Sequence, residues 1–297
     1  MRSKIALHNM EDKIAELPLL PQVLVRILQL DPKSEEYFEE FEHSAKEDPA
    51  FAVRVIALAN SAASSPIAPI SVIRDALARM GATTVASFVA SLAVQRVFMP
   101  TEPNQILLWK HSISTAVGAQ RVAELVPQLQ IPAGHAYLVG LLHDVGRFVM
   151  FEHAPKQLLA VDEHNWRTPD DLEAVDVEVF NFTHSELGSL ACEHWGVPDP
   201  IAEIIRHHHT PLQGSIAPRS GDATTFCVQV ADRLAVTLID SGDYEALSDD
   251  ERMERIALYC LKSDEERRLL AVDRLAAEVP MIRRESEHLM QNLGLHL

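Results

Sequence analysis

Apolar residues recur at intervals of three and four along almost the whole chain, which is the period of an amphipathic helix. In the stretch PQVLVRILQL, for example, Val23, Ile27 and Leu30 fall at positions i, i+4 and i+7 of one helical face. No stretch shows convincingly the alternation of apolar and polar residues that is typical of a β-strand. The pattern therefore predicts an all-α protein.

Local signals mark where individual helices begin and end. One long helix is expected over about residues 106–127, and another over about residues 135–151. Thr183 followed by Glu186 has the spacing of a capping box, and Gly196 stands where that helix should end. These signals predict a separate helix between positions 183 and 196.

Two proline-bearing stretches indicate how the chain is divided. MPTEPNQ at residues 99–105 contains two prolines, and LQGSIAPRSGD at residues 212–222 also has the composition of a linker. We therefore predict an N-terminal helical lobe over residues 1–100 and a second lobe over 101–212. The helices over 213–297 would complete the second lobe.

Composition and charge narrow the class of protein. The 297 residues are 47% hydrophobic and 23% charged, and only 11 are glycine, as in a helical globular protein. The 43 acidic residues against 26 basic ones give a formal charge of −17. Such a surface repels phosphate backbones and anionic lipids, so we expect no direct binding to nucleic acid or to membranes.

The cysteines and the apolar runs favour a cytoplasmic location. Cys192, Cys227 and Cys260 are far apart and form no C-x-x-C pair, as expected of reduced, buried thiols. The N-terminal MRSKIALHNMEDK lacks the apolar core of a signal peptide. The longest apolar run, VASFVASLAV, is about half as long as a membrane span. We therefore expect a cytoplasmic protein.

Two acidic residues lie where the helical period predicts buried positions. Asp144 shares its row with Tyr137, Leu141 and Phe148, and Asp232 shares its row with Val228, Val236 and Ile239. A buried carboxylate without a partner costs several kcal/mol. Histidines supply candidate partners, namely His111, His143, His184 and the trio His207 to His209. Imidazoles and carboxylates that converge from separate helices form a site for a divalent metal ion.

Each of these residues also has an ordinary structural explanation. His111 can be a buried histidine bonded to a backbone carbonyl, and His184 can be a first-turn residue beside its cap. The histidine trio can favour a helix C-terminus through the helix dipole, and Asp232 beside Arg233 can face solvent. The metal interpretation gains weight from the chain order, in which His, His-Asp, His, His and Asp follow one another.

That order resembles the HD superfamily of metal-dependent phosphohydrolases. The stretches LANSA (58–62), LLHDVG (141–146), FTHSELG (182–188) and HWGVP followed by IIRHHH resemble a narrower group, the HDOD family. This is the HD-related output domain of bacterial signalling proteins. The resemblance covers about residues 13–212 and extends more loosely to Asp232.

The resemblance implies metal ligands. It assigns His111, His143, Asp144 and Asp232 to a first ion. It assigns His184 with one or two of the trio His207 to His209, of which we name His208, to further ions. The ion would be Mn, Fe, Mg, Zn or Ni, and it would activate water and polarise a phosphoryl oxygen. Because only neutral imidazole binds an ion, occupancy should fall below about pH 6.

The resemblance also assigns catalytic candidates, with departures from the active enzymes. Asp144 and Arg147 are the candidates, Arg147 as a phosphate contact whose guanidinium should face the metal cluster rather than a surface carboxylate. The cyclic-dinucleotide phosphodiesterases of this superfamily carry an acidic ligand one turn before the first histidine, where this chain has Leu107. They carry Gly-Lys after His-Asp, where this chain has Gly146-Arg147, and their glycine-tyrosine-proline signature is absent.

Two functions are therefore expected from the resemblance. The first is a bacterial signal-transduction domain that acts through protein partners and binds a divalent metal. The second is an active metal-dependent phosphohydrolase for a nucleotide, a cyclic dinucleotide or another phosphodiester. The departures at Leu107 and Arg147 favour the first.

Overall fold

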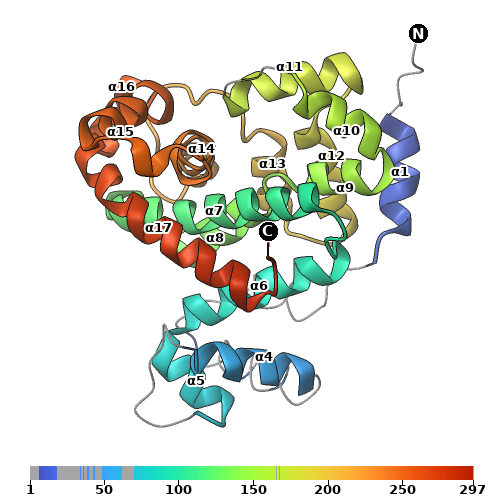
Figure 1. Cartoon of the computed structure of the whole chain (residues 1–297), viewed down its shortest axis with the longest axis vertical. Coiled ribbons are helices and arrows are strands. Elements are labelled where there is room, and N and C mark those ends of the chain that lie inside the picture. Colours follow the sequence, from blue (N-terminus) through green and yellow to red (C-terminus); the bar gives the residue numbers. More distant parts are fainter. Residues whose placement is uncertain are drawn as a thin grey trace. The chain divides into compact units, whose positions relative to one another are not determined.

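Every regular element in the described part of the chain is a helix (Figure 1). The computed structural model describes residues 7–18, 49–61, 70–164 and 168–296, together with Trp166 and a few single positions between 34 and 43. No strand occurs among them, so the all-α prediction is confirmed. The helix predicted around Val23 to Leu30 lies outside the described residues.

The chain divides into two compact units. The large unit consists of Met1–Leu17, Pro100–Glu287 and Leu297, and the small unit consists of Pro18–Met99 and His288–His296. The division into residues 1–100, 101–212 and 213–297 that the sequence indicated stays a prediction. The candidate metal residues all belong to the large unit.

The small unit contains α4 (Pro49–Ala59), α5 (Ile73–Met80) and α6 (Ala82–Val97) in its described part. Gln95 on α6 donates a hydrogen bond to the carbonyl oxygen of Leu293 at 2.9 Å and so ties α6 to the C-terminal residues of the same unit. No single helix among the described residues has both the length and the hydropathy to cross a bilayer. Among the described residues, one pair of helices bent by 114°, Ile73–Met80 and Thr83–Val97, reaches that length and hydropathy when the two are taken together.

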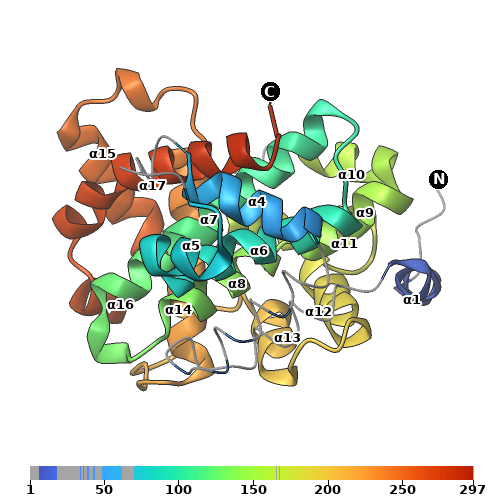
Figure 2. The same ribbon diagram turned by 90° about the horizontal axis from the view of Figure 1, so that it is seen from below.

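The large unit is built around α7 (Pro103–Leu125), which packs against α8 (Ala133–Leu142) and α14 (Gly221–Leu234) (Figure 2). Between α8 and α14 the chain forms α9 (Val145–His153), α10 (Pro155–Asp162), α11 (Pro169–Val179), α12 (His184–His194) and α13 (Asp199–Arg206). After α14 come the π-helix η2 (Ala235–Ile239), η3 (Tyr244–Ala246), α15 (Asp249–Arg255), the π-helix η4 (Ile256–Cys260), α16 (Asp264–Leu269) and α17 (Val272–Asn292). The short η1 (Pro127–Leu129) follows α7, and α1 (Leu7–Glu16) packs against α9 and α12.

Glycines let the helices that carry the candidate centre approach at backbone distance. A β-carbon at Gly140 on α8 would lie 2.9 Å from the Cα of Ala116 on α7. A β-carbon at Gly146 on α9 would lie 2.0 Å from the carbonyl oxygen of His184 on α12. Since real β-carbons do not approach other atoms so closely, a larger residue at either position would push the paired helices apart.

The ends of α12 follow the predicted signals. Thr183 caps the helix by accepting from the amide of Glu186 at 3.1 Å, and the Glu186 carboxylate accepts from the amide of Thr183 at 2.9 Å. Gly196 follows the end of the helix with φ of 70°, a left-handed conformation that glycine adopts without strain. Both positions agree with the capping box and the stop expected from the sequence.

The single helix predicted over residues 135–151 is wrong. The chain forms α8 and α9 instead, with a break at His143 and Asp144, where Asp144 has φ of −97° and ψ of 16°. The apolar period continues on both sides of the break, so periodicity alone does not reveal it. The side chain of Asp144 lies near His111 on α7 and His184 on α12, at 3.7 and 3.1 Å between the nearest nitrogen and oxygen.

Candidate metal centre

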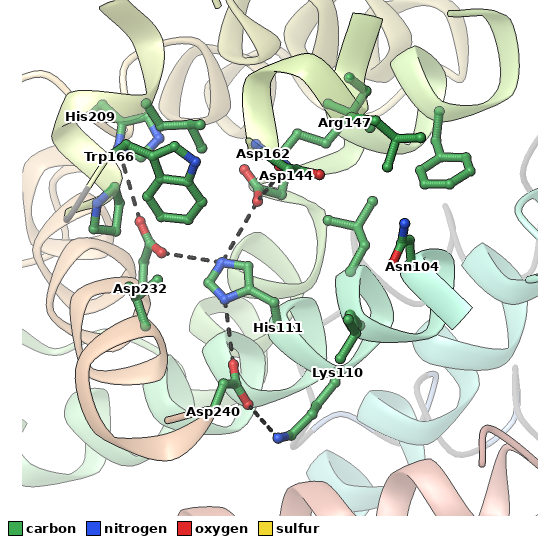
Figure 3. A pocket seen from close by; sticks show the side chains of 18 residues that line it. Asn104, Lys110, His111, Asp144, Arg147, Asp162, Trp166, His209, Asp232 and Asp240 are labelled. Atoms are coloured by element: carbon green, nitrogen blue, oxygen red, sulfur yellow. Dashed lines mark hydrogen bonds and ion pairs between the residues drawn. The ribbon is translucent and has the colours of Figure 1, made fainter. Parts of the chain in front are cut away.

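Five segments of the large unit bring histidine and aspartate side chains to one centre, of which Figure 3 shows His111, Asp144, His209 and Asp232. They are His111 on α7, His143 and Asp144 at the α8–α9 junction, His184 at the start of α12, His208 and His209 after α13, and Asp232 on α14. All are buried except His111, whose side chain is 18% exposed. The structure thus brings together all the residues that the sequence assigned to metal, while their role as ligands stays a prediction.

His111, His143 and Asp144 form a first group, with Asp232 beside it. Nε2 of His111 lies 3.2 Å from Oδ1 of Asp232 and 3.7 Å from Oδ2 of Asp144. Nε2 of His143 lies 3.7 Å from Oδ1 of Asp144 and 3.9 Å from Oδ1 of Asp232. One donor atom from each member of the group lies within 4.8 Å of the others, a spacing that a single ion can bridge.

A second group consists of Asp144, His184, His208 and His209. Nε2 of His184 lies 3.1 Å from Oδ1 of Asp144 and 3.0 Å from Nε2 of His209. Nε2 of His208 lies 3.9 Å from the same oxygen of Asp144. Because Asp144 belongs to both groups, its carboxylate can serve two ions.

Backbone carbonyls fix the orientation of two of the histidine rings. Nδ1 of His143 bonds to the carbonyl oxygen of Gly140, and Nδ1 of His208 bonds to that of Ile205, both at 2.7 Å. An oxygen acceptor at Nδ1 places the ring proton there and leaves the Nε2 lone pair facing the centre, as metal coordination requires. Nε2 of His143 is buried and has no hydrogen-bond partner among the described residues, which is the expected state of a ligand atom.

Asp176 on α11 fixes the orientation of the His184 ring by accepting at Nδ1. Its Oδ2 lies 2.5 Å from Nδ1 of His184 and also accepts from the backbone amide of His184 at 3.0 Å. The residue is fully buried. Asp176 was not among the residues expected from the sequence, although it stands four residues from both Leu172 and Phe180 on a buried helical row, which is the signal that identified Asp144.

Asp240 reaches His111 because of the π-helix η2. Its Oδ2 lies 3.6 Å from Nδ1 of His111, and Ser114 donates to its Oδ1 at 2.9 Å. Asp240 comes eight residues after Asp232, whereas residues seven apart share a face of a regular α-helix. The amide of Asp240 bonds to the carbonyl of Ala235, five residues earlier, and this one-residue insertion turns both aspartates toward the same side.

The carboxylates let two of the buried histidines carry protons. Burial opposes a charge on His111, but its interactions with the carboxylates of Asp232, Asp240 and Asp144 outweigh burial and raise its pKa to about 10. Burial also opposes a charge on His184, but the charges of Asp176 and Asp144 outweigh it and raise that pKa to about 10. In the metal-free protein, protons on these two rings therefore occupy the place that a cation would take.

The pKa values of His208 and Asp144 at the same centre are lowered instead of raised. Burial, followed by the neighbouring charges of His143 and His184, lowers the pKa of His208 to about 3. Burial alone would raise the pKa of Asp144, but the charges of His143, His184 and Arg147 hold it well below its ordinary value. The centre thus holds an ionised carboxylate beside a neutral imidazole, the donor set of a divalent transition metal.

The histidine trio is divided by the structure. His208 and His209 are buried at the centre, whereas the side chain of His207 is 53% exposed and lies 3.2 Å from Glu203. From the sequence, one or two of the trio were expected as ligands, and His208 was the one named. A run of three histidines at a helix end does not show which rings turn inward, because the turn after α13 decides their directions.

A cavity of about 420 Å³ opens onto the centre. His111, Asp144, His209 and Asp232 line one part of it. The rest of the lining is mainly apolar and includes Leu107, Phe151, Leu158, Leu159, Trp166 and Leu172. A ligand in this cavity would therefore touch the candidate metal residues directly.

Arg147 lines the same cavity and is shared between two carboxylates. Its Nε lies 3.8 Å from Oδ2 of Asp144, and its Nη2 donates to Oδ1 of Asp162 at 2.5 Å. The side chain of Asp162 is 38% exposed, so one edge of the guanidinium faces the centre and the other faces a more exposed carboxylate. The catalytic roles assigned to Asp144 and Arg147 stay predictions.

The chain is similar in sequence or in fold to several known proteins. An uncharacterized protein of Treponema pallidum (strain Nichols) is 24% identical over 201 residues, and the chain covers 39% of that relative's length. A structure from Shewanella amazonensis SB2B, named provisionally as a phosphohydrolase, has a TM-score of 0.69 at 19% identity and covers 96% of this chain and 97% of its own. A structure from Marinobacter aquaeolei VT8, named provisionally as a signal transduction protein, has a TM-score of 0.72 at 22% identity, over 97% of this chain and 64% of its own.

These likenesses, all below 25% identity, establish the fold rather than an activity. The match to a family model is more specific. The model described as the HDOD domain matches residues 17–211, well over half of the chain, and these residues include His111, His143, Asp144, His184 and His208. The chain therefore belongs to the HDOD family.

Proposed function

We propose that this chain is a signal-transduction domain whose His/Asp centre binds divalent metal ions. The observation that carries the proposal is the orientation of the imidazoles. His143, His184 and His208 each turn Nδ1 to an oxygen acceptor and Nε2 toward Asp144. HDOD membership and the name of the Marinobacter relative support the signalling role.

The two groups of donors differ in composition. His111, His143 and Asp144, with Asp232 beside them, would hold one ion, and Asp144 with His184, His208 and His209 would hold another. Imidazole nitrogens outnumber carboxylate oxygens in the second group, which favours Fe, Zn or Ni over Mg. Elemental analysis of protein purified without chelator would identify the ion.

The histidine trio provides a matched pair of variants for a test of metal binding. The full chain is titrated with Mn²⁺ by calorimetry, as wild type, His208→Ala and His207→Ala. His208→Ala removes a buried inward donor and should weaken binding of at least one ion by tenfold or more (about 1.4 kcal/mol). His207→Ala removes an exposed ring and should leave binding unchanged. No saturable Mn²⁺ binding by the wild type would overturn the proposal.

Hydrolysis of a phosphate ester is a second candidate, favoured by the cavity that opens onto His111, Asp144, His209 and Asp232. Bound divalent ions would polarise a phosphoryl oxygen and make a water nucleophilic at neutral pH. Arg147 would donate from Nη1, which is buried and has no hydrogen-bond partner in the described part of the chain. Its support among relatives is the provisional name of the Shewanella protein.

The hydrolysis candidate has its own test. The Mn²⁺-loaded chain is assayed against nucleoside monophosphates, cyclic nucleotides and cyclic dinucleotides. Turnover that is lost in Asp232→Asn would support it, whereas no turnover by protein with bound Mn²⁺ would exclude it for these substrates and leave the signalling proposal standing.

We also propose the cellular setting that the sequence indicated. The domain would act in the bacterial cytoplasm through protein partners, with a nucleotide or phosphodiester as its candidate small ligand. The formal charge of −17 supports this setting, because such an acidic surface repels nucleic acid and anionic membranes. Co-purification from a cytoplasmic fraction with a signalling protein would test this setting.

A further inference from the structure

The cavity beside the centre has two chemically different parts. His111, Asp144, His209 and Asp232 make one part polar. Leucines from three helices make the other part apolar, namely Leu107 on α7, Leu158 and Leu159 on α10, and Leu172 on α11. Metal binding alone requires only the polar part. Ligand pockets combine an apolar wall with a few placed polar groups, and this cavity of about 420 Å³ has both.

Two buried donors at this cavity have no partner in the described part of the chain. They are the indole Nε1 of Trp166 and Nη1 of Arg147, whose side chain is more than nine-tenths buried. In the view of Figure 3 the carboxylates of Asp144 and Asp162 lie between these two side chains. A buried donor without an acceptor is costly, so a small rotation of either side chain toward an acceptor oxygen of a ligand in the cavity would remove that cost.

We infer that the cavity binds a phosphorylated ligand whose organic body is apolar or aromatic. The phosphoryl group lies at the metal ions and accepts from Arg147 and Trp166, and the body lies on the leucine wall and the indole ring. The inference rests on the proposed metal binding and deepens it by naming the class of ligand.

The partners of the polar lining residues argue against a ligand that places hydroxyl groups on the leucine wall. Lys110 lies 3.6 Å from Asp240, and Arg147 donates to Asp162. Asn104 is the one uncharged amide among the described residues that line the cavity. Sugar hydroxyls on the leucine wall would be buried without hydrogen bonds, at a cost in affinity. Inorganic phosphate would leave the wall without contact.

Three phosphonates that share a head group and resist hydrolysis test the inference. Methylphosphonate, 2-hydroxyethylphosphonate and phenylphosphonate are titrated by calorimetry into the full chain saturated with Mn²⁺. Phenylphosphonate should bind about tenfold more tightly than the other two, because only its body buries apolar surface on the wall. Methylphosphonate and 2-hydroxyethylphosphonate should bind alike.

Two exposed leucines give a matched control. Leu107 is 50% exposed and lines the cavity, and Leu258 is 59% exposed and does not. Leu107→Ala should reduce the phenyl-to-methyl ratio of affinities by about threefold, while Leu258→Ala should not change it. Trp166→Phe retains a ring but removes the N–H donor, so it should weaken all three phosphonates by a similar factor.

Each outcome bears on a different claim. Equal affinities for the three phosphonates in Mn²⁺-loaded protein would overturn the inference and leave metal binding intact. An unchanged ratio in Leu107→Ala, or unchanged affinities in Trp166→Phe, would also overturn it. Failure of Mn²⁺ to bind in the first step would overturn the proposed function and the inference with it.

Discussion

At the scale of single residues, the centre depends on which nitrogen of each histidine carries the proton. His143 and His208 are held by backbone carbonyls, which no side-chain substitution removes. His184 and His111 instead face carboxylates, Asp176 at 2.5 Å and Asp240 at 3.6 Å. These two aspartates are therefore positioning residues that mutagenesis can test.

Asp240→Asn should weaken Mn²⁺ binding by about tenfold, measured by calorimetry on the full chain. The neutral amide retains the size of the side chain but loses the charge that orients Nδ1–H of His111. Asp243→Asn is the control, because Asp243 is exposed and pairs with Arg255 away from the centre. If Asp240→Asn and Asp243→Asn bound Mn²⁺ with equal affinity, Asp240 would have no positioning role.

The sequence reveals the candidate ligands better than the groups that orient them. His111, His143 and Asp232 have the chain order of a known family, so the sequence alone is enough to name them. It is not enough for Asp240, because a π-helix brings this residue to His111 and helical periodicity assumes a regular α-helix. Asp176 carries a signal that the sequence does contain, since it interrupts an apolar row as Asp144 does.

At the scale of elements, the break between α8 and α9 explains how two neighbouring residues reach one centre. Adjacent residues on a regular helix point about 100° apart. At the junction, His143 ends α8 and Asp144 leaves the helical conformation before α9 begins. His143 Nε2 and Asp144 Oδ1 consequently lie 3.7 Å apart. Capping residues made the ends of α12 predictable, but this break depends on contacts with other helices.

Gly146→Ala should destabilise the large unit by about 2 kcal/mol or more, measured by chemical denaturation. A β-carbon there would lie 2.0 Å from the carbonyl oxygen of His184, so α9 and α12 must separate. That movement would also displace Asp144 from His184, and Mn²⁺ affinity should fall together with stability.

Gly242→Ala is the matched control for this substitution. A β-carbon at Gly242 would meet no atom within 4 Å, and its φ is not positive. Stability and Mn²⁺ affinity should therefore remain close to those of the wild type. If Gly146→Ala were as stable as Gly242→Ala, the close packing of α9 on α12 would not be required.

At the scale of the whole molecule, the candidate centre joins segments that are far apart in sequence. His111 and Asp232 are separated by more than a third of the chain, yet Nε2 of His111 lies 3.2 Å from Oδ1 of Asp232. An ion at this point would hold α7, α9, α12 and α14 together. Metal binding should therefore stabilise the fold of the large unit and not only its local site.

Mn²⁺ at a fixed concentration, about one hundred times its Kd at pH 6.5, should raise the melting temperature at that pH by roughly 5–10 °C relative to metal-free protein, measured by calorimetry. The increment should also grow as the pH rises from 6.5 to 8.5. His111 and His184 have pKa values raised to about 10 in the metal-free protein, so their protonated rings stabilise it fully below the ordinary histidine pKa near 6.5. That stabilisation is lost progressively as the pH rises toward about 10.

The metal-loaded protein should lack this loss, because the ion binds neutral imidazole and takes over the role of the protons. The melting temperature of the metal-free protein should thus fall with rising pH, while that of the loaded protein should stay nearly level. The raised pKa values also imply that protons compete with the ion well above the pH of about 6 expected from an ordinary histidine. His184→Ala removes one of the two rings and should reduce both the increment and its pH dependence, whereas His207→Ala should change neither. An increment that is constant or shrinks between pH 6.5 and 8.5 would show that His111 and His184 are not protonated in the metal-free centre.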